Sequence, residues 1–336
     1  MINIRHDKEL KDLNTFGIAA RAAGYVEFCN KYDLDAIFSD ATWKSRPWYV
    51  LSGGSNILLT GDYEGLILHP VSDKIEEVSR DSRSIQLRVE AGVEWDSFVG
   101  YCVEKGYGGV ENLSDIPGYV GASPVQNVGA YGVEVKDTIV EVEAYLVETQ
   151  EIRLFNNQEC RFGYRDSIFK NEWKGRAIVT SVTFSLSLTP DFHIGYGDLA
   201  REVESLGGAT LENIRRAVRA IRAAKLPDPA VLGNSGSFFK NPVVDIRKAE
   251  ELKSNYPDIP VYPAPNGVKL AAGWLIDRAG LKGYRSGNAG VHEKQALVLV
   301  NYGGATGLEI LALADYVITN VEEKFGVRLG MEVNVL

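Results

Sequence analysis

Residues 116–132 read IPGYVGASPVQNVGAYG, and this stretch decides the fold. Four glycines, two prolines and two side-chain amides fall within it, a composition too rich in special backbone positions for a helix or a strand. It also lacks the charge that is typical of a solvated linker. A buried loop must satisfy its own backbone N–H and C=O groups, and a polar cofactor could supply the partners. An ordered glycine-rich loop without a ligand is the alternative.

Strands and helices are predicted on both sides of this loop. Apolar and polar residues alternate over 85–91 and over 178–188, which predicts two strands. Apolar residues at helical spacing over 95–103, followed by Gly106, predict a helix. The two kinds of element intermix without strict βαβ order, so the expected fold class is α+β. One face of the second strand is expected to carry Ile178, Thr180, Val182, Phe184, Leu186 and Leu188.

Three helices and a last strand are predicted in the C-terminal third of the chain. A basic amphipathic helix begins at Leu211 and ends before Lys225, and two more run from about 269 to 279 and from about 307 to 325. The last strand is expected to place Arg328, Glu332 and Asn334 on one face and Val327, Leu329, Met331, Val333 and Val335 on the other.

The composition excludes several classes of protein. The 336 residues carry a formal net charge of −9, which argues against a nucleic-acid-binding surface. No apolar run approaches the roughly 20 residues of a membrane span, and no signal-peptide core is visible. The widely spaced Cys29, Cys102 and Cys160 are expected to be reduced, buried thiols in a cytoplasmic protein. The four histidines show no metal-ligand spacing, so no metal is expected.

A second small-residue segment, LSGGSN at 51–56, follows the apolar residues 48–50. A strand that runs into small residues leaves backbone N–H groups open to an anion such as a pyrophosphate, although a plain turn is the alternative. A GxGxxA match at 195–200 looks like a dinucleotide fingerprint. Pro190 and His193 interrupt the strand that this motif requires, so no nucleotide is expected there.

Two further segments carry candidate reactive groups. Arg165 lies in FGYRDS and suits a carboxylate or a developing enolate, with an ion pair to Asp166 as the alternative. Ser237 lies in LGNSGSFFKNP at 232–242, where it could be a buried hydroxyl in a dry site. The sequence has no GxSxG elbow, and His292 is the only histidine after Ser237, so an acyl-transfer nucleophile is not expected.

Taken together, these strings resemble the UDP-N-acetylenolpyruvoylglucosamine reductase (MurB) family. A YGDL segment at 196–199 looks like the type I branch, whose substrate loop carries a tyrosine. Single strings of this kind are weak signals, but seven in family order are specific. The seven are NTFG (14–17), GGSN (53–56), GASPVQNVGAYGVE (121–134), YRDS (164–167), GSFFKNP (236–242), AGWLID (272–277) and the segment 292–301.

The resemblance implies a three-part α+β fold. Residues 1–70 and 71–210 would be the two subdomains of a PCMH/VAO-type FAD-binding region, and 211–325 would be an α+β substrate-binding domain. The strand 326–336 could return to the first subdomain. The implied oxidoreductase acts in peptidoglycan precursor synthesis in the cytoplasm. It reduces the enolpyruvyl ether of UDP-N-acetylglucosamine to UDP-N-acetylmuramate with non-covalent FAD and with NADPH as co-substrate.

The resemblance also implies roles for individual residues. Arg165 would stabilise the enolate, Glu332 would lie near the same carboxylate, and Ser237 would donate a proton to the enolate carbon. The implied FAD contacts are Ser52, Gly53, Gly54, Ser55, Asn56, Ile57, Ile116, Pro117, Ser123, Pro124, Gln126, Asn127 and Gly129. The implied substrate contacts are Tyr131, Tyr196, Lys225, Asn241, Tyr262, Lys269 and Gln295.

Two other functions stay open at this point. A PCMH-type flavin oxidase would share the FAD-binding region, but such oxidases often tether flavin to His or Cys, and neither glycine-rich loop contains one. A nucleotide-sugar-binding protein without redox chemistry would be colourless. The expected partner is a UDP-sugar, with no nucleic acid and no membrane, and the expected state is a monomer.

Overall fold

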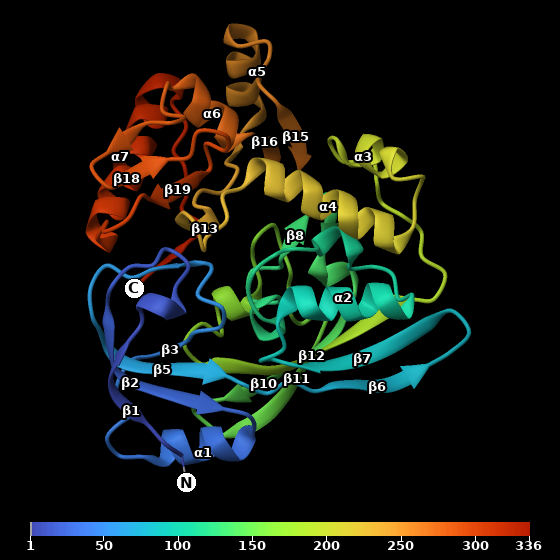
Figure 1. Ribbon diagram of the computed structural model, residues 1–336, viewed down its shortest axis with the longest axis vertical. Helices are drawn as coiled ribbons and strands as arrows, with labels where there is room; N and C mark the ends of the chain where they lie inside the picture. The colour runs from blue at the N-terminus through green and yellow to red at the C-terminus, as the bar shows by residue number, and fades with distance from the viewer. Residues whose placement is uncertain (1) are drawn as a thin grey trace. The chain divides into compact units, whose positions relative to one another are not determined.

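A computed structural model describes residues 2–336 (Figure 1). The chain forms two compact units, each described here by itself. Unit 1 comprises residues 2–8, 22–53 and 64–224, and unit 2 comprises 9–21, 54–63 and 225–336. Helices accompany mainly antiparallel sheets in a mixed order along the chain, which confirms the predicted α+β class. The three-part division stays a prediction.

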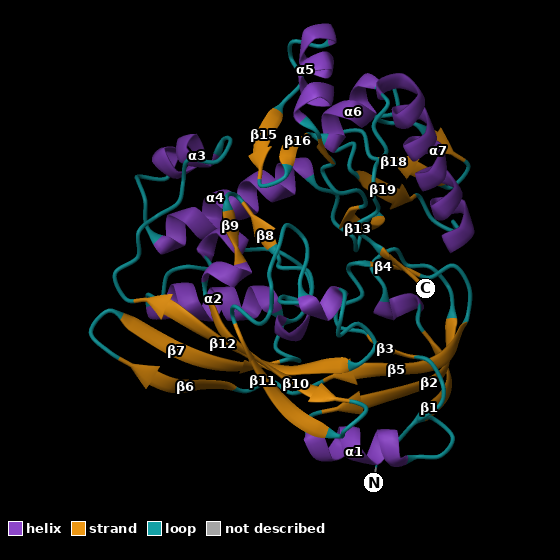
Figure 2. Ribbon diagram, turned by 180° about the vertical axis from the view of Figure 1, so that it is seen from behind, coloured by secondary structure: helices purple, strands orange, loops and turns teal. Residues whose placement is uncertain are grey.

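The first sheet of unit 1 supplies the strand that leads into the first glycine-rich loop. In this sheet β3 (Trp48–Val50) pairs parallel with β5 (Tyr63–Pro70), Trp48 opposite Leu66. Helix α1 (Lys31–Ser39) lies against the sheet (Figures 1 and 2) and buries Leu34 and Ile37. The strand order is β1 (Arg5–Glu9), β2 (Arg21–Phe28), β5 (Tyr63–Pro70) and β3 (Trp48–Val50).

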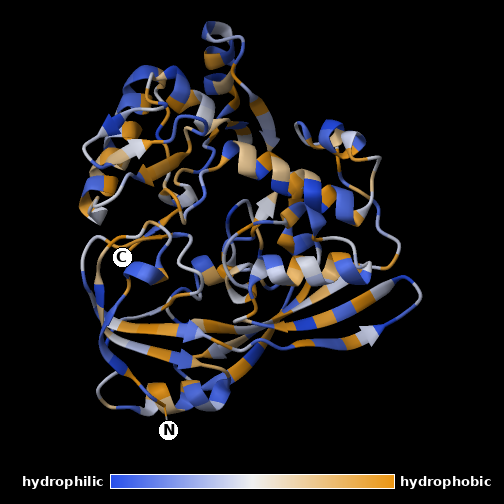
Figure 3. Cartoon of the chain, in the orientation of Figure 1, coloured by the Kyte–Doolittle hydropathy of each residue, from blue (hydrophilic) through white to orange (hydrophobic). Residues whose placement is uncertain are grey.

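The second sheet of unit 1 is antiparallel and holds the larger core. Helix α2 (Trp95–Lys105) covers one face, where the Phe98 and Phe184 rings lie 4.8 Å apart. Gly106 ends the helix in a left-handed conformation, as predicted. Figure 3 shows hydrophobic residues alternating with hydrophilic ones along β7 (Ser84–Glu90). The strand order is β11 (Glu151–Asn156), β10 (Ile139–Leu146), β12 (Ala177–Ser187), β7 (Ser84–Glu90) and β6 (Ile75–Arg80).

Two sequence expectations for unit 1 are wrong. The pairing of β12 with β10 shifts register at Thr180, so Val179 joins the core that contains Val182, whereas Ile178 joins the core of the first sheet. A bulge adds one residue and reverses the alternation, which a pattern of period two does not foresee. Cys29 is exposed rather than buried, because it lies in the turn before α1; all three thiols are free.

The other elements of unit 1 lie between and after the strands of the large sheet in the chain. A two-stranded hairpin of β8 (Gly129–Ala130) and β9 (Val133–Glu134) ends the long glycine-rich loop. Helices α3 (Leu199–Ser205) and α4 (Leu211–Lys225) come after β12. Helix α4 includes Lys225, one residue beyond the predicted end. No helix in the described part of the chain has both the length and the apolar character that a membrane crossing needs.

Unit 2 is built around three small sheets and three helices. One sheet has the order β13 (Gly233–Ser237), β19 (Val298–Asn301), β18 (Ala289–Val291) and β17 (Arg285–Ser286), and a second the order β14 (Val243–Val244), β16 (Gly267–Leu270) and β15 (Val261–Ala264). The third pairs β20 (Asn334–Val335) parallel with β4 (Ile57–Leu58). The helices are α5 (Ile246–Asn255), α6 (Ala272–Arg278) and α7 (Gly307–Phe325).

Helix α7 has the predicted bounds, because its ends carry strong signals. Thr306 and Glu309 form a capping box, and Gly326 ends the helix in a left-handed conformation.

The predicted start of the helix at residue 269 is wrong. Lys269 lies in β16, opposite Tyr262 of β15 and Val243 of β14, and the helix begins only at Ala272.

The predicted last strand is also wrong in extent. Only β20 is a strand, and Met331 makes an isolated bridge with Phe239. The side chains of Val327, Leu329 and Val333 are buried as the pattern predicts, but the intervening backbone has no strand beside it. Apolar alternation predicted the burial of these three side chains correctly, but Val335 on the same expected face is exposed. The extent of the strand was predicted incorrectly, since the pattern reflects side chains and not backbone partners.

Candidate active site

The first glycine-rich loop begins where β3 ends. Gly54 has φ +62°, and a Cβ there would lie 2.0 Å from the Leu13 carbonyl oxygen, so glycine is required. A Cβ at Gly53 would lie 3.2 Å from Cα of Gly118, so this loop closely approaches the second one. Within residues 2–336 no hydrogen bond uses the amide N–H groups of Gly53 and Gly54. Such open amides suit an anion.

The second loop is bonded along its first half to the segment that leads into α2. The Trp95 amide donates to the Gly118 carbonyl at 2.9 Å, and the Val120 amide donates to the Val93 carbonyl at 2.8 Å. The Gly121 amide donates to Ala91 in the same way, at 3.0 Å. These bonds fix the backbone of a stretch that has no regular strand partner.

Two predicted FAD contacts in this loop, Asn127 and Ser123, differ in their side-chain hydrogen bonds. Asn127 has φ +46° and its side-chain amide donates to the Gly163 carbonyl at 2.8 Å, while its oxygen accepts from the Lys136 amide at 3.2 Å. Its side chain therefore holds the loop in shape. Ser123 is 2% exposed, and its hydroxyl has no hydrogen-bond partner within the described residues. A buried hydroxyl without a partner is costly, and a polar cofactor beside the loop could supply one.

Arg165 lies against the end of the same loop. It has φ +53°, and its Nη2 donates to the Gly129 carbonyl at 2.6 Å. Its guanidinium carbon lies 5.5 Å from the centre of the Tyr164 ring. The Ser167 hydroxyl donates to the Val125 carbonyl at 2.7 Å, so the turn is bonded to the loop at two points. The structure thus brings Arg165 together with Gly129, one of the predicted FAD residues of unit 1.

Tyr131 and Tyr196, two predicted substrate contacts, also meet in unit 1. Their ring centres are 6.2 Å apart and nearly perpendicular. Asn112 joins their segments, because its side-chain amide donates to the carbonyls of Tyr131 at 3.0 Å and His193 at 2.7 Å. Tyr196 is 52% exposed, whereas burial raises the pKa of Tyr131. An exposed phenol on an irregular segment is suited to contact a ligand.

In unit 2, Ser237 and Glu332 lie on neighbouring backbone segments. The Phe238 amide donates to the Leu297 carbonyl at 2.7 Å, and the Glu332 amide donates to the Phe238 carbonyl at 2.8 Å. The Ser237 hydroxyl makes no hydrogen bond within residues 2–336 and is not among the fully buried polar atoms. It is therefore available to a ligand.

The chain end anchors the Glu332 segment. The Asn334 amide donates to the Asn56 carbonyl at 3.1 Å, and the Leu336 amide donates to the Leu58 carbonyl at 2.9 Å. The Thr60 amide donates to the Leu336 carbonyl at 2.8 Å. These bonds hold the backbone that follows Glu332 in place.

Four predicted substrate contacts surround the first turn of α6. Oδ1 of Asn241 accepts from the Ala272 amide at 2.9 Å, and a Cβ at Gly273 would lie 3.3 Å from Oε1 of Gln295. Lys269 and Tyr262 are opposite each other in the hairpin that leads into this turn, with Nζ 5.9 Å from the ring centre. Lys225, the last residue of α4, is exposed.

The predicted site residues divide between the units. Unit 1 holds Ser52, Gly53, Ile116, Pro117, Ser123, Pro124, Gln126, Asn127, Gly129, Tyr131, Arg165 and Tyr196. Unit 2 holds Gly54, Ser55, Asn56, Ile57, Lys225, Ser237, Asn241, Tyr262, Lys269, Gln295 and Glu332. Their individual roles stay predictions.

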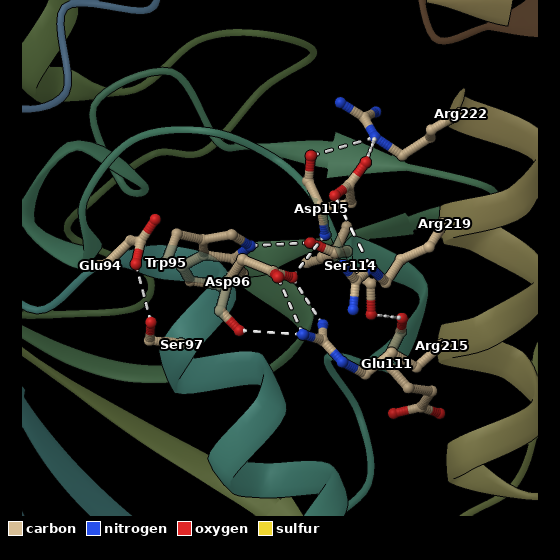
Figure 4. Close-up of polar contacts among 11 residues, drawn as sticks. Glu94, Trp95, Asp96, Ser97, Glu111, Ser114, Asp115, Arg215, Arg219 and Arg222 are labelled. Atoms are coloured by element: carbon tan, nitrogen blue, oxygen red, sulfur yellow. Dashed lines mark hydrogen bonds and ion pairs between the residues drawn. The ribbon is translucent and has the colours of Figure 1, made fainter. Parts of the chain in front are cut away.

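Sequence reasoning missed a group of charged residues that we call the α2–α4 charge cluster (Figure 4): Asp96, Asp115, Arg215, Arg219 and Arg222. Arg215 binds both carboxylate oxygens of Asp96, at 2.5 and 2.8 Å. Burial would raise the pKa of Asp96, but its hydrogen bonds with Arg215 and with the Asp115 amide outweigh burial and lower it. The spacing of the three arginines along one helix face was a visible signal, whereas nothing in the sequence indicated their partners.

Comparison with known protein families defines the class, a flavoprotein of mixed α+β fold that binds FAD. The model of the FAD binding domain family matches residues 22–154, which include all of the predicted FAD contacts. The model of the UDP-N-acetylenolpyruvoylglucosamine reductase C-terminal domain matches residues 228–336.

Similarity to curated proteins extends over the whole chain. A UDP-N-acetylenolpyruvoylglucosamine reductase of Chromobacterium violaceum is 50% identical, with 100% of this chain and 99% of the relative covered. One of Porphyromonas gingivalis is 48% identical, with 100% of both covered. The chain belongs to the UDP-N-acetylenolpyruvoylglucosamine reductase family. A crystal structure of the Thermus caldophilus reductase matches with TM-score 0.67 at 23% identity, over 100% of this chain and 98% of that one, which shows the shared fold.

Proposed function

We propose that this protein reduces the enolpyruvyl ether of UDP-N-acetylglucosamine to UDP-N-acetylmuramate, with FAD as cofactor and NADPH as co-substrate, in cytoplasmic peptidoglycan precursor synthesis. The observation that carries the proposal is the 50% identity to a reductase of that name over the full chain. The accessible Ser237 hydroxyl and the position of Arg165 at the end of an FAD loop support it. FAD supplies the hydride when it is bound.

Ser237 is proposed as the proton donor. When the methylene carbon of the enolpyruvyl group accepts a hydride, negative charge develops at the neighbouring carbon and spreads into the carboxylate. The Ser237 hydroxyl gives its proton to that carbon, and the serine oxygen regains a proton from water. A hydroxyl is a weak acid, but an enolate carbon is basic enough to take its proton in a dry site.

Arg165 and Glu332 are proposed to act on the same enolate. The Arg165 guanidinium is already oriented by its bond to the Gly129 carbonyl, so little reorganisation is needed when charge develops. A charged Glu332 would repel the substrate carboxylate. Glu332 is therefore protonated during the reaction, or it polarises neighbouring donors through hydrogen bonds.

A direct assay tests the proposal. The purified protein should show flavin absorbance, and NADPH consumption should depend on the enolpyruvyl substrate. Mass spectrometry should find a product heavier by two hydrogen atoms. A colourless protein would support a non-redox binding protein instead, and substrate-dependent consumption of dioxygen without NADPH would support an oxidase.

FAD is expected to be bound without a covalent bond. Neither glycine-rich loop contains a Cys or His that could be tethered, and burial raises the pKa of both Cys102 and Cys160, which keeps these thiols protonated and unreactive. Denaturation followed by filtration should release all yellow colour into the filtrate. Flavin retained with the polypeptide would contradict this expectation.

Tyr196→Phe is expected to weaken substrate binding. If the Tyr196 hydroxyl donates to a substrate phosphate, its loss should cost about 1.5–3 kcal/mol and raise the KM for the UDP-sugar. Reduction of bound FAD by NADPH is expected to continue, as followed by flavin absorbance. Tyr32→Phe is the control, since Tyr32 is 81% exposed and lies far from Tyr196 in the sequence. An unchanged KM in Tyr196→Phe would exclude the proposed contact.

A further inference from the structure

Arg222 of the α2–α4 charge cluster is fixed at one edge of its guanidinium group. Its Nε donates to the Asp115 carbonyl oxygen at 3.1 Å and lies 3.4 Å from Oδ2 of the same residue. The side chain is only 17% exposed. Figure 4 shows both contacts at the same nitrogen, with the two terminal nitrogens turned away from Asp115.

Those two terminal nitrogens are open. Neither Nη1 nor Nη2 makes a hydrogen bond within residues 2–336, and neither is among the fully buried polar atoms. A guanidinium has five N–H donors in a rigid fork, so four remain for a ligand. A mostly buried cation whose orientation is fixed, and whose terminal donors are accessible, suits an anion that offers several oxygens.

The charge balance of the cluster favours an anion as well. The positive charge of Arg215 is balanced by the carboxylate of Asp96, to which it donates two hydrogen bonds. Arg219 and Arg222 share one carboxylate, that of Asp115, at 3.9 and 3.4 Å. Three guanidinium groups therefore face two carboxylates, and one positive charge is left in excess. Arg219 is 57% exposed and largely screened by water, so the excess is concentrated at Arg222.

The neighbours of Arg222 indicate which anion. Burial raises the pKa of Tyr131, and the positive charge of Arg222 opposes that rise, so the guanidinium lies near the phenol group. The Tyr131 ring in turn contacts the Tyr196 ring. Lys225 follows Arg222 by one turn of α4. All three neighbours are predicted substrate contacts.

We propose that Arg222 binds the diphosphate of the UDP-sugar through its two terminal nitrogens, and that Asp115 is the positioning residue that orients it. The inference rests on the proposed function, because the nucleotide substrate is the ligand. Asp115 is well suited to this role: its amide donates to Asp96 at 2.6 Å and its backbone has φ +63°. The carbonyl and carboxylate that hold Nε therefore come from a residue that is itself fixed.

UDP is the probe that tests this inference. Titration calorimetry on the FAD-loaded protein gives its Kd at constant ionic strength. Arg222→Gln is expected to raise the Kd about 10- to 100-fold, the range for hydrogen bonds to a charged group. Arg222→Lys keeps the positive charge but loses the two-pronged geometry of the guanidinium group. Its Kd for UDP should therefore lie between those of the wild type and of Arg222→Gln. Arg219→Gln removes the same charge one turn earlier, and its Kd should stay within about twofold.

Flavin content and thermal unfolding are measured for each variant, and Arg222→Lys decides the question if Arg222→Gln does not fold. UDP affinity that is unchanged in the folded Arg222 variants would overturn the inference. Loss of FAD without a change in UDP affinity would also overturn it, since the arginine would then serve the cofactor. A wild-type protein that does not bind UDP would count against the proposed function itself. Asp115→Asn should raise the Kd less than Arg222→Gln, because the carbonyl contact to Nε remains.

Discussion

Ser237→Ala is expected to slow turnover of the enolpyruvyl substrate by about 10² to 10⁴-fold, the usual contribution of a general acid. The reduction of bound FAD by NADPH needs no proton at the sugar carbon, so it should keep nearly its normal rate. Loss of one oxygen at a partly exposed position should cost little stability. Stopped-flow absorbance at the flavin band measures the two half-reactions separately.

Ser235→Ala is the matched control for this experiment. Ser235 lies two residues earlier in β13, and its buried hydroxyl has no partner within the described chain. Its removal deletes a hydroxyl from the same strand without breaking a hydrogen bond between described residues, and no proton transfer is assigned to it, so the rates of the two half-reactions should keep their wild-type ratio. If Ser237→Ala slows both half-reactions equally, or neither, then Ser237 is not the proton donor.

Arg165→Gln is expected to lower kcat by about 10² to 10³-fold, the loss seen when one donor to a developing oxyanion is removed. The enolate would then form without its nearest cation. KM should change less than kcat, because the charge that Arg165 stabilises is greatest after hydride addition. Steady-state kinetics with the enolpyruvyl substrate checks this division.

Arg161→Gln controls for the loss of an arginine from the same segment. Arg161 also has a left-handed backbone, with φ +45°, but it is 66% exposed and pairs with Glu172. Its substitution should leave kcat nearly unchanged. Equal losses in the two variants would point to disruption of the turn rather than to stabilisation of the enolate.

Local signals predicted much of the fold. Helix α7 lies between a capping box and a left-handed glycine, and α2 ends at Gly106, so both helices were predicted well. The strand over 85–91 was also predicted, because one face is buried and the other is not. In each case the information lies within a few residues of the element.

The errors arose where distant residues decide the structure. Lys269 is in a strand because β14 and β15 lie on either side of β16, and the bulge at Thr180 depends on the register with β10. The candidate site follows the same rule. Motifs identified Arg165 and Ser237, but the fixation of Arg222 depends on Asp115, which is 107 residues away in the chain. No pattern along the sequence contains that pairing.

The way unit 2 is assembled has a consequence for folding. Its core joins residues 9–21 and 54–63 to residues 225–336, as in the bond from the Asn301 side chain to the Phe16 carbonyl, which spans 285 residues. Contacts of such high sequence separation close late and slowly. During synthesis the two early segments can bond to each other, as from the Thr15 amide to the Gly54 carbonyl, but they must wait for residues 225–336 until nearly the whole chain has emerged. A fragment that starts at Lys225 lacks β4, the partner of β20, and so cannot complete the unit that carries Ser237 and Glu332.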